Sequence, residues 1–281
     1  MIPMRKLQYT FKTDTLFKML FVKHPDLLKK LVSALLAIPL ESIGQFVIRN
    51  EEIAPENLGD KFCRLDINMV VNGQLVDLEV QIADEGDYPE RVMLYWAREF
   101  SSALPAGQSY TMLPRTIIIS ILDFNLFDCT QFHSFFQPLE VTRHTLLSDK
   151  MGFHFFELRK LPDEVSEKDA LLLWLALFNA NTEEDLDKIQ AMEVPEMSQA
   201  INAYYTITAS PEFREVERLR EKARHDEAQA LYHARNEGKI EGKIEIARNL
   251  LKIDLPMGQI VAVTGLTAEE VERLRREEAA G

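Results

Sequence analysis

The chain has few cysteines and no long apolar run. Its 281 residues include only Cys63 and Cys129, which is too few for a disulfide framework or a cysteine-rich zinc site. We expect both to be small buried apolar residues. The strongest apolar run, Leu171–Phe178, is far shorter than the roughly 20 residues that a membrane-spanning helix needs. Residues 1–14 have no apolar stretch long enough for a signal peptide, so we expect a cytoplasmic protein.

An excess of positive charge is also absent. The chain holds 32 lysines and arginines against 45 acidic residues, a net charge of −13, which argues against a generic nucleic-acid coat protein. The charge is uneven, because residues 1–50 carry eight basic and three acidic residues. An enzyme that acts on DNA can be acidic overall if basic residues line its approach, but an ordinary acidic protein can also begin with a basic helix. Apolar residues make up 46% of the chain and charged residues 27%, as in soluble globular proteins.

The hydrophobic periodicity divides the chain into a mixed zone and a helical zone. In the mixed zone we predict helices that start near residues 14 and 25 and a helix over 89–104, with strands over 45–49, 63–71, 74–82, 116–122 and 153–159. This order belongs to the α/β or α+β class. From about residue 164 the pattern predicts only helices, over 171–179, 183–192, 197–208, 211–252, 256–263 and 267–276. We therefore predict an α/β domain over 1–162, a helical subdomain over 163–210, and a long charged helix with a small helical tail over 211–281.

The C-terminal part contains a four-residue repeat that places Gly238 and Gly242 one helical turn apart. Glycine destabilises a helix by about 1 kcal/mol relative to alanine, so the repeat favours a close helix–helix contact or a hinge, or alternatively a flexible solvated linker. The last predicted helix carries three glutamates beside three arginines, and two more glutamates follow it, which is a poor composition for reading a DNA groove. We favour a module for protein interaction or self-association, and a homodimer through these helices is one expectation.

The candidate chemistry lies in a predicted hairpin around Asn72-Gly73. Both residues tolerate positive φ, so an Asn-Gly pair between alternating strands is a strong hairpin signal. A two-residue turn there places Asp66 opposite Glu79 and Asn68 opposite Asp77. One face of the hairpin is then apolar and must be core, whereas the other face is acidic and amide-rich.

Two directly opposed carboxylates destabilise a strand pair unless something neutralises them. A divalent cation bound between Asp66 and Glu79 would do so, and Mg²⁺ prefers one or two carboxylates together with water and substrate phosphate. The alternative is an acidic face exposed to solvent, where repulsion is screened and weak.

These residues carry a resemblance to a known family. Asp66 followed by Glu79-Val80-Gln81 resembles the acidic core of the PD-(D/E)XK phosphodiesterase superfamily. More narrowly, the chain is similar to the recombination-promoting nuclease (Rpn) family, also called the PD-(D/E)XK nuclease family transposases. Further matching segments are 14–21, 61–67, 91–96, 155–160 and the glycine-containing tail with residues 246–251.

The resemblance implies a restriction-endonuclease-like α/β core with a helical C-terminal extension. It also implies a Mg²⁺-dependent DNA endonuclease associated with recombination or mobile elements. Asp66 and Glu79 would hold the metal, together with the backbone carbonyl of Val80. Gln81 stands where the superfamily usually has lysine, and it would orient the attacking water without carrying charge. Lys18 or Lys61 would be candidates for the missing positive charge.

Two further positions remain open. Asp14 resembles an acidic residue of the first helix that joins the active site in this superfamily, but aspartate is also favoured at any helix start. Arg91 and Tyr95 lie four apart on a predicted helix, where they would contact phosphate, or form a surface ion pair and part of the core. The runner-up function is a catalytically weak or inactive nuclease fold that acts as a DNA- or protein-binding module, because Gln81 replaces lysine and the chain is acidic.

Overall fold

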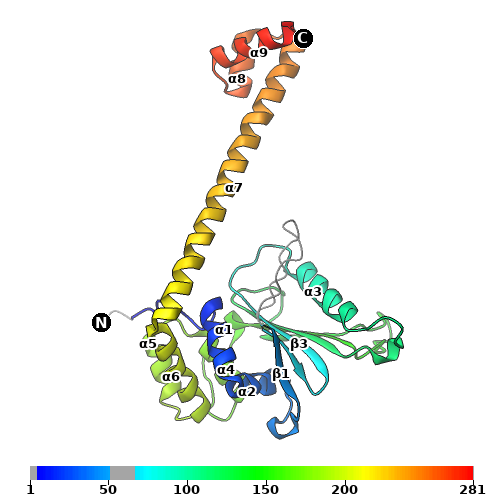
Figure 1. The fold of residues 1–281 in the computed structure, drawn as a ribbon, viewed down its shortest axis with the longest axis vertical. Helices are drawn as coiled ribbons and strands as arrows, with labels where there is room; N and C mark the ends of the chain where they lie inside the picture. The colour runs from blue at the N-terminus through cyan, green and yellow to red at the C-terminus, as the bar shows by residue number, and fades with distance from the viewer. Residues whose placement is uncertain (1–4, 51–66, 281) are drawn as a thin grey trace. The chain divides into compact units, whose positions relative to one another are not determined.

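The computed structural model describes residues 5–50 and 67–280, and these form two compact units that divide between Arg214 and Glu215 (Figure 1). The described part contains a mixed β-sheet and a set of α-helices, as expected for an α/β protein. Its helices are α1 (Asp14–Lys23), α2 (Pro25–Leu35), α3 (Tyr88–Ser102), α4 (Ala170–Asn179), α5 (Glu183–Gln190), α6 (Pro195–Ala209), α7 (Pro211–Lys252), α8 (Met257–Thr264) and α9 (Ala268–Ala280). Its strands are β1 (Phe46–Asn50), β2 (Ile67–Val71), β3 (Gln74–Gln81), β4 (Thr116–Leu122), β5 (His133–Phe136) and β6 (Met151–Glu157).

The sheet has the order β1-β2-β3-β4-β6-β5. The outer pairs are antiparallel, whereas β3 pairs with β4 and β4 with β6 in parallel. The run of isoleucines predicted as a buried strand is β4, at the centre of the parallel part and buried along its whole length. The edge strand β5 was not predicted from the sequence, because a segment of four residues is too short to show an alternating pattern.

The predicted hairpin register is confirmed over the residues that the structure describes. Asn72 and Gly73 both have positive φ, 48° and 76°, and the pairs run from Val71 opposite Gln74 to Ile67 opposite Leu78. Asp66, the predicted partner of Glu79, lies outside the described residues, so that pair stays a prediction. The Asn72 side chain also accepts hydrogen bonds from the backbone of Gly44 and Gln45, both at 3.0 Å, and so holds the segment that leads into β1.

Helices cover both faces of the sheet. One face packs on α1, α2, α4, α5 and α6 through a large apolar core that includes Leu78, Ile119 and Trp174 (Figure 1). The other face packs on α3 through a smaller core that contains Tyr88, Val92, Ile118 and Phe155. Tyr95 of α3 belongs to this second core, as one of the predicted alternatives had it, and Trp96 packs against it. The helices over 163–210 thus share the main core, and their predicted separation from 1–162 stays a prediction that limited proteolysis would test.

The second unit is the remainder of α7 with α8 and α9. A small core around Ala247, Ile260, Val271 and Leu274 joins the three helices. Gly265 ends α8 with a φ of +64°, a left-handed conformation that glycine adopts without steric cost. A Cβ placed on Gly238 or Gly242 would meet no atom within 4 Å among the described residues, so the repeat makes no close helix contact there. Within the described ranges, no helix is both long and apolar enough to cross a membrane.

Candidate active site on the α3 side of the sheet

Strand β3 directs its polar residues toward α3. Successive side chains of a strand point to opposite faces, so Asp77, Glu79 and Gln81 share the face on which α3 packs, whereas Val76 and Leu78 enter the main core. Asp77 is fully buried and Glu79 is 1% exposed. The acidic face is therefore not a solvent-facing surface, and the alternative of weak, screened repulsion does not apply to these two carboxylates.

Burial shifts the pKa of one carboxylate on this face, Asp77. Burial raises the pKa of Asp77 well above its ordinary value, and the neighbouring charges of Glu99 and Glu79 raise it further. The amide of Asn68, directly across the hairpin, donates to Asp77 Oδ1 and partly opposes the increase. Asn68 and Asp77, which were predicted to lie opposite each other, therefore form a buried hydrogen bond. This bond stabilises the hairpin beside Glu79.

Glu79 is held by groups that the sequence did not indicate. The Tyr88 hydroxyl donates to Glu79 Oε2 at 3.3 Å and lies 2.8 Å from Ser120 Oγ. Tyr88 starts α3 and is fully buried, and Ser120 pairs with Glu79 in the parallel register of β3 and β4. A single polar residue inside an otherwise apolar central strand was the signal that could have identified Ser120.

Gln81 is bound by an arginine from α3. An Nη atom of Arg91 donates to Gln81 Oε1 at 3.0 Å, and the other Nη atom pairs with Glu85 Oε2 at 3.1 Å. The guanidinium also lies over the Tyr88 ring, 5.1 Å from its centroid. Arg91 was predicted either to contact phosphate or the site, or to form a surface ion pair, and it forms an ion pair with Glu85. Its hydrogen bond to Gln81 leaves a role in the site a prediction.

The remaining predicted site residues are placed as follows. Asp14 begins α1 and pairs with Lys18 at 3.4 Å, an arrangement typical of residues four apart on a helix. Lys18 is therefore engaged within its own helix. Val80 lies between Glu79 and Gln81 in β3, with its side chain against the main core. Asp66 and Lys61 lie outside the described residues, so their roles stay predictions.

A buried lysine stands beside the end of β3. Lys12 is 7% exposed, and its Nζ lies 2.9 Å from Asp123 Oδ2 and 3.4 Å from Asn181 Oδ1. The backbone amide of Asp123 in turn donates to the carbonyl of Gln81 at 2.8 Å. A buried lysine has to be paired, and this pair fixes the segment before α1 to the strand ends next to the candidate site.

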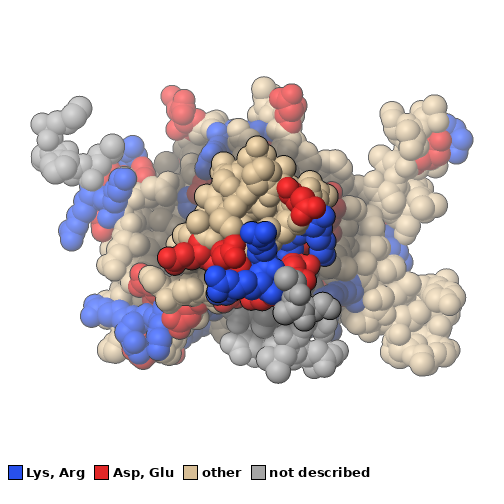
Figure 2. All heavy atoms as spheres, turned by 90° about the horizontal axis from the view of Figure 1, so that it is seen from above, with Lys and Arg blue, Asp and Glu red and all other residues tan. Residues whose placement is uncertain are grey.

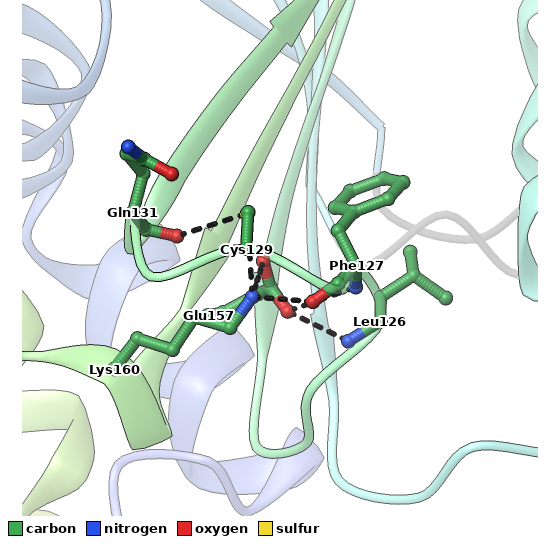
Figure 3. Close-up of polar contacts among 6 residues, drawn as sticks. All are labelled: Leu126, Phe127, Cys129, Gln131, Glu157 and Lys160. Carbon is green, nitrogen blue, oxygen red and sulfur yellow. Dashed lines mark hydrogen bonds and ion pairs between the residues drawn. The ribbon is translucent and has the colours of Figure 1, made fainter.

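The segment 155–160, which matches the family, has a structural role in the fold (Figure 3). Glu157 is fully buried at the end of β6 and accepts hydrogen bonds from the backbone of Leu126 and Phe127 at 2.6 and 3.2 Å. Lys160 completes this arrangement, 2.8 Å from Glu157 Oε2 and 2.7 Å from the Phe127 carbonyl. Together these contacts hold the loop after β4 in place.

Cys129 in the same loop corrects an expectation. It was predicted to be a small buried apolar residue, but it is exposed and its Sγ lies 3.6 Å from Lys160 Nζ. The loop connects β4 to the edge strand β5. In this loop Phe127, and not Cys129, packs against the apolar core. Cys63 lies outside the described residues.

The structure describes two of the predicted metal ligands, Glu79 and Val80. Among the described residues no three His, Cys, Asp or Glu side chains gather as a metal-binding group. The Glu79 carboxylate and the Val80 carbonyl are hard oxygen donors, which suit Mg²⁺ better than soft metals. The carboxylate predicted to complete the site, Asp66, lies outside the described residues.

Basic residues do not form a broad surface on the face seen in Figure 2, where lysines and arginines are interspersed with acidic side chains. In α9 the arginines are paired with glutamates, for example Arg276 with Glu272 at 3.7 Å and Arg273 with Glu277 at 3.9 Å.

Comparison with known proteins identifies the family. The family model of the PD-(D/E)XK nuclease family transposases matches residues 11–234, which include all six strands, α3 and the candidate site. No curated protein and no solved structure matches the chain. Nucleases of the PD-(D/E)XK type usually use divalent metals. With its sheet, its buried Glu79 and its helical C-terminal part, the chain belongs to the PD-(D/E)XK nuclease family transposases, nucleases associated with mobile elements.

Proposed function

We propose that the protein is a Mg²⁺-dependent endonuclease that hydrolyses phosphodiester bonds in DNA during recombination or the movement of mobile elements. The observation that carries this proposal is the placement of Glu79. The Glu79 side chain is 1% exposed and is held by the Tyr88 hydroxyl, and it shares a sheet face with Gln81, to which Arg91 of α3 donates. A buried carboxylate next to an amide and a guanidinium is a suitable arrangement for binding a cation and a phosphate together.

The roles proposed for the residues follow from their chemistry. Asp66, Glu79 and the carbonyl of Val80 would hold the metal. When bound there, Mg²⁺ would polarise the scissile phosphate and lower the pKa of a water molecule. Gln81 would hold the attacking water through its amide, and Tyr88 would keep the Glu79 carboxylate in one orientation. For Asp14 we propose a supporting acidic role at the start of α1.

The second candidate is a catalytically weak or inactive nuclease fold that binds DNA or protein. It is favoured by Gln81, because this amide stands where a positively charged lysine is usual, and by the net charge of −13. The two functions differ in one measurable property, which is cleavage of the phosphodiester backbone in the presence of metal.

A plasmid assay distinguishes them. Purified protein is incubated with supercoiled plasmid in Mg²⁺ or in EDTA, and nicked and linear products are measured. We expect cleavage only with Mg²⁺, and its loss in Glu79→Gln, which keeps the shape of the side chain and removes its charge. The matched control is Glu90→Gln, which makes the same change at an exposed position of α3. Wild-type protein that binds the plasmid without cutting it would favour the second candidate, and undiminished cleavage by Glu79→Gln would exclude the proposed metal site.

We also propose that the C-terminal helices form a homodimer, which would allow two cuts on one duplex. The support is a set of exposed apolar side chains on α7, among them Tyr232 and Ile240, which are 64% and 54% exposed and lie on adjoining faces of the helix. Sedimentation velocity should show a dimer for the full chain and a monomer for Ile240→Glu. A monomeric wild-type protein at micromolar concentration would contradict this.

A further inference from the structure

We infer that Arg91 is a phosphate-binding residue of the candidate site, and that it provides the positive charge that strand β3 itself lacks. This inference rests on the proposed function, because the phosphate in question is the scissile or a neighbouring phosphate of DNA. The position two residues after Glu79 is Gln81, a neutral side chain on the same face. The cationic group nearest to that amide in the described structure is the guanidinium of Arg91, at 3.0 Å.

Three contacts orient this guanidinium. It donates to Gln81 Oε1, it lies over the Tyr88 ring at 5.1 Å from the centroid, and it pairs with Glu85. Tyr88 also binds Glu79, so a single side chain positions both the carboxylate and the guanidinium. Because Gln81 accepts through Oε1, its Nε2 group is the end that can donate to an oxygen of the substrate.

The contact with Glu85 is the one that a phosphate can replace. The Glu85 side chain is 67% exposed, and it lies in the segment between β3 and α3, whereas the side chain of Arg91 is 23% exposed. An ion pair with such an exposed carboxylate contributes little stability. A phosphodiester oxygen offers the same charge and accepts two parallel N–H donors from an arginine. The Arg91 Nε atom is buried and has no hydrogen-bond partner among the described residues, so the two Nη groups are the donors that face a phosphate.

This arrangement explains how a neutral residue can occupy the motif position. A lysine at residue 81 would place its ammonium beside the guanidinium of Arg91, and two like charges there would repel each other. The glutamine instead accepts a hydrogen bond from the arginine, so the charge reaches the site from α3. Arg91→Gln and Gln81→Lys should therefore compensate each other, although each alone is unfavourable or of little benefit.

The first test measures DNA binding without metal. Fluorescence anisotropy with a labelled DNA duplex in EDTA, at several salt concentrations, gives the affinity and its salt dependence. Losing one phosphate contact should reduce the slope of log K against log salt by about 0.9. We expect this for Arg91→Gln, with a loss of affinity of about tenfold, and not for Arg98→Gln, which removes the same charge from an exposed position of α3. Glu85→Gln removes the competing carboxylate and should strengthen binding a few-fold.

The second test measures cleavage and rescue. Arg91→Gln should lower the Mg²⁺-dependent cleavage rate by about a hundredfold, as removal of one preorganised donor commonly does. The double variant Arg91→Gln/Gln81→Lys should cleave at least tenfold faster than Arg91→Gln alone, because the positive charge then comes from strand β3. A merely structural role of Arg91 would show no such rescue, and the melting temperatures of all variants provide the check on folding.

The outcomes separate this inference from the proposed function. Wild-type protein that does not cleave, with a reduced salt slope in Arg91→Gln, would reject the nuclease and keep the phosphate-binding residue. Wild-type protein that cleaves, with Arg91→Gln equal to it in rate and salt slope, would overturn the inference alone. Loss of cleavage with an unchanged salt slope and no rescue by Gln81→Lys would also overturn it.

Discussion

At the scale of single residues, Tyr88 has the most direct influence on the candidate site. It is fully buried, and its hydroxyl contacts both Glu79 and Ser120. Tyr88→Phe keeps the ring and removes the hydroxyl, which leaves buried polar atoms with one partner fewer. We expect the free energy of unfolding to fall by about 1–3 kcal/mol. We also expect plasmid cleavage to fall about tenfold, because Glu79 loses the group that orients it.

Chemical denaturation and the plasmid assay check this prediction. The matched control is Tyr110→Phe, the same change at a side chain that is 81% exposed, and it should alter neither property. If Tyr88→Phe cleaves at the wild-type rate, the contact with Glu79 has no role in the reaction.

Glu79 itself allows a second prediction at this scale. Its charge is one of the causes that raise the pKa of Asp77, since the two carboxylates share a buried face. Glu79→Gln removes that repulsion, so the variant should be at least as stable as wild-type protein in EDTA. Thermal melting in EDTA provides the measurement. A melting temperature several degrees lower would show that the Glu79 side chain stabilises the fold. The role of Glu79 in cleavage would then have to be tested with another variant that folds normally.

At the scale of elements, the edge strand β5 is joined to β6 by a pair of histidines. His133 Nε2 lies 3.1 Å from His154 Nδ1, a contact that requires one neutral ring nitrogen to accept the hydrogen bond. Burial, together with the charges of His133 and Arg115, lowers the pKa of His154 from an ordinary value of 6.5 to about 4. Between these pH values the unfolded chain binds a proton that the folded chain does not, so stability is present above pH 6.5 and is lost as the pH falls toward 4.

We therefore predict that the pairing of β5 with β6 loses stability at acidic pH. Relative to pH 7, the His154 contribution to the free energy of unfolding should fall by about 2 kcal/mol at pH 5. Guanidinium chloride unfolding at the two pH values measures this. In His154→Gln the difference between the two pH values should shrink by that amount, whereas His225→Gln, at an exposed position of α7, should leave it unchanged. Equal pH dependence in wild-type protein and His154→Gln would contradict the prediction.

At the scale of the whole molecule, the boundary between the two units makes a sharp prediction about truncation. All strands and the candidate site belong to the unit that ends at Arg214. Phe213 is fully buried in the main core and packs on Tyr9 with the ring centroids 4.8 Å apart. A chain that ends at 214 should fold with its sheet intact, whereas a chain that ends at 210 loses Phe213 and about 3–5 kcal/mol.

Circular dichroism and chemical denaturation of the two truncated chains test this pair directly. The shorter chain is the matched control, because the two differ by only four residues at the start of α7. An unfolded 1–214 chain would mean that the second unit is needed for the first to fold. Equal stability of the two chains would mean that Phe213 contributes little to the core.

The sequence alone determined the features that depend on local periodicity and turn chemistry. The Asn72-Gly73 turn predicted the register of β2 and β3, because positive φ at both residues and alternating apolar side chains permit only one pairing. The bounds of α7 and β4 were predicted as the structure has them, since an unbroken helical or apolar pattern marks each of them. The family was also predicted, from short motifs in the expected order.

Only the tertiary structure decided what surrounds Glu79 and Gln81. Packing of α3 on the sheet turned a face that could have been solvated into a buried one, and it brought Tyr88, Arg91 and Ser120 to residues on other elements. The same holds for Lys12, whose partner Asp123 lies 111 residues away. Such contacts depend on which helix packs on which face and at what height along the strands. This is set by long-range packing, and no local pattern of residues encodes it.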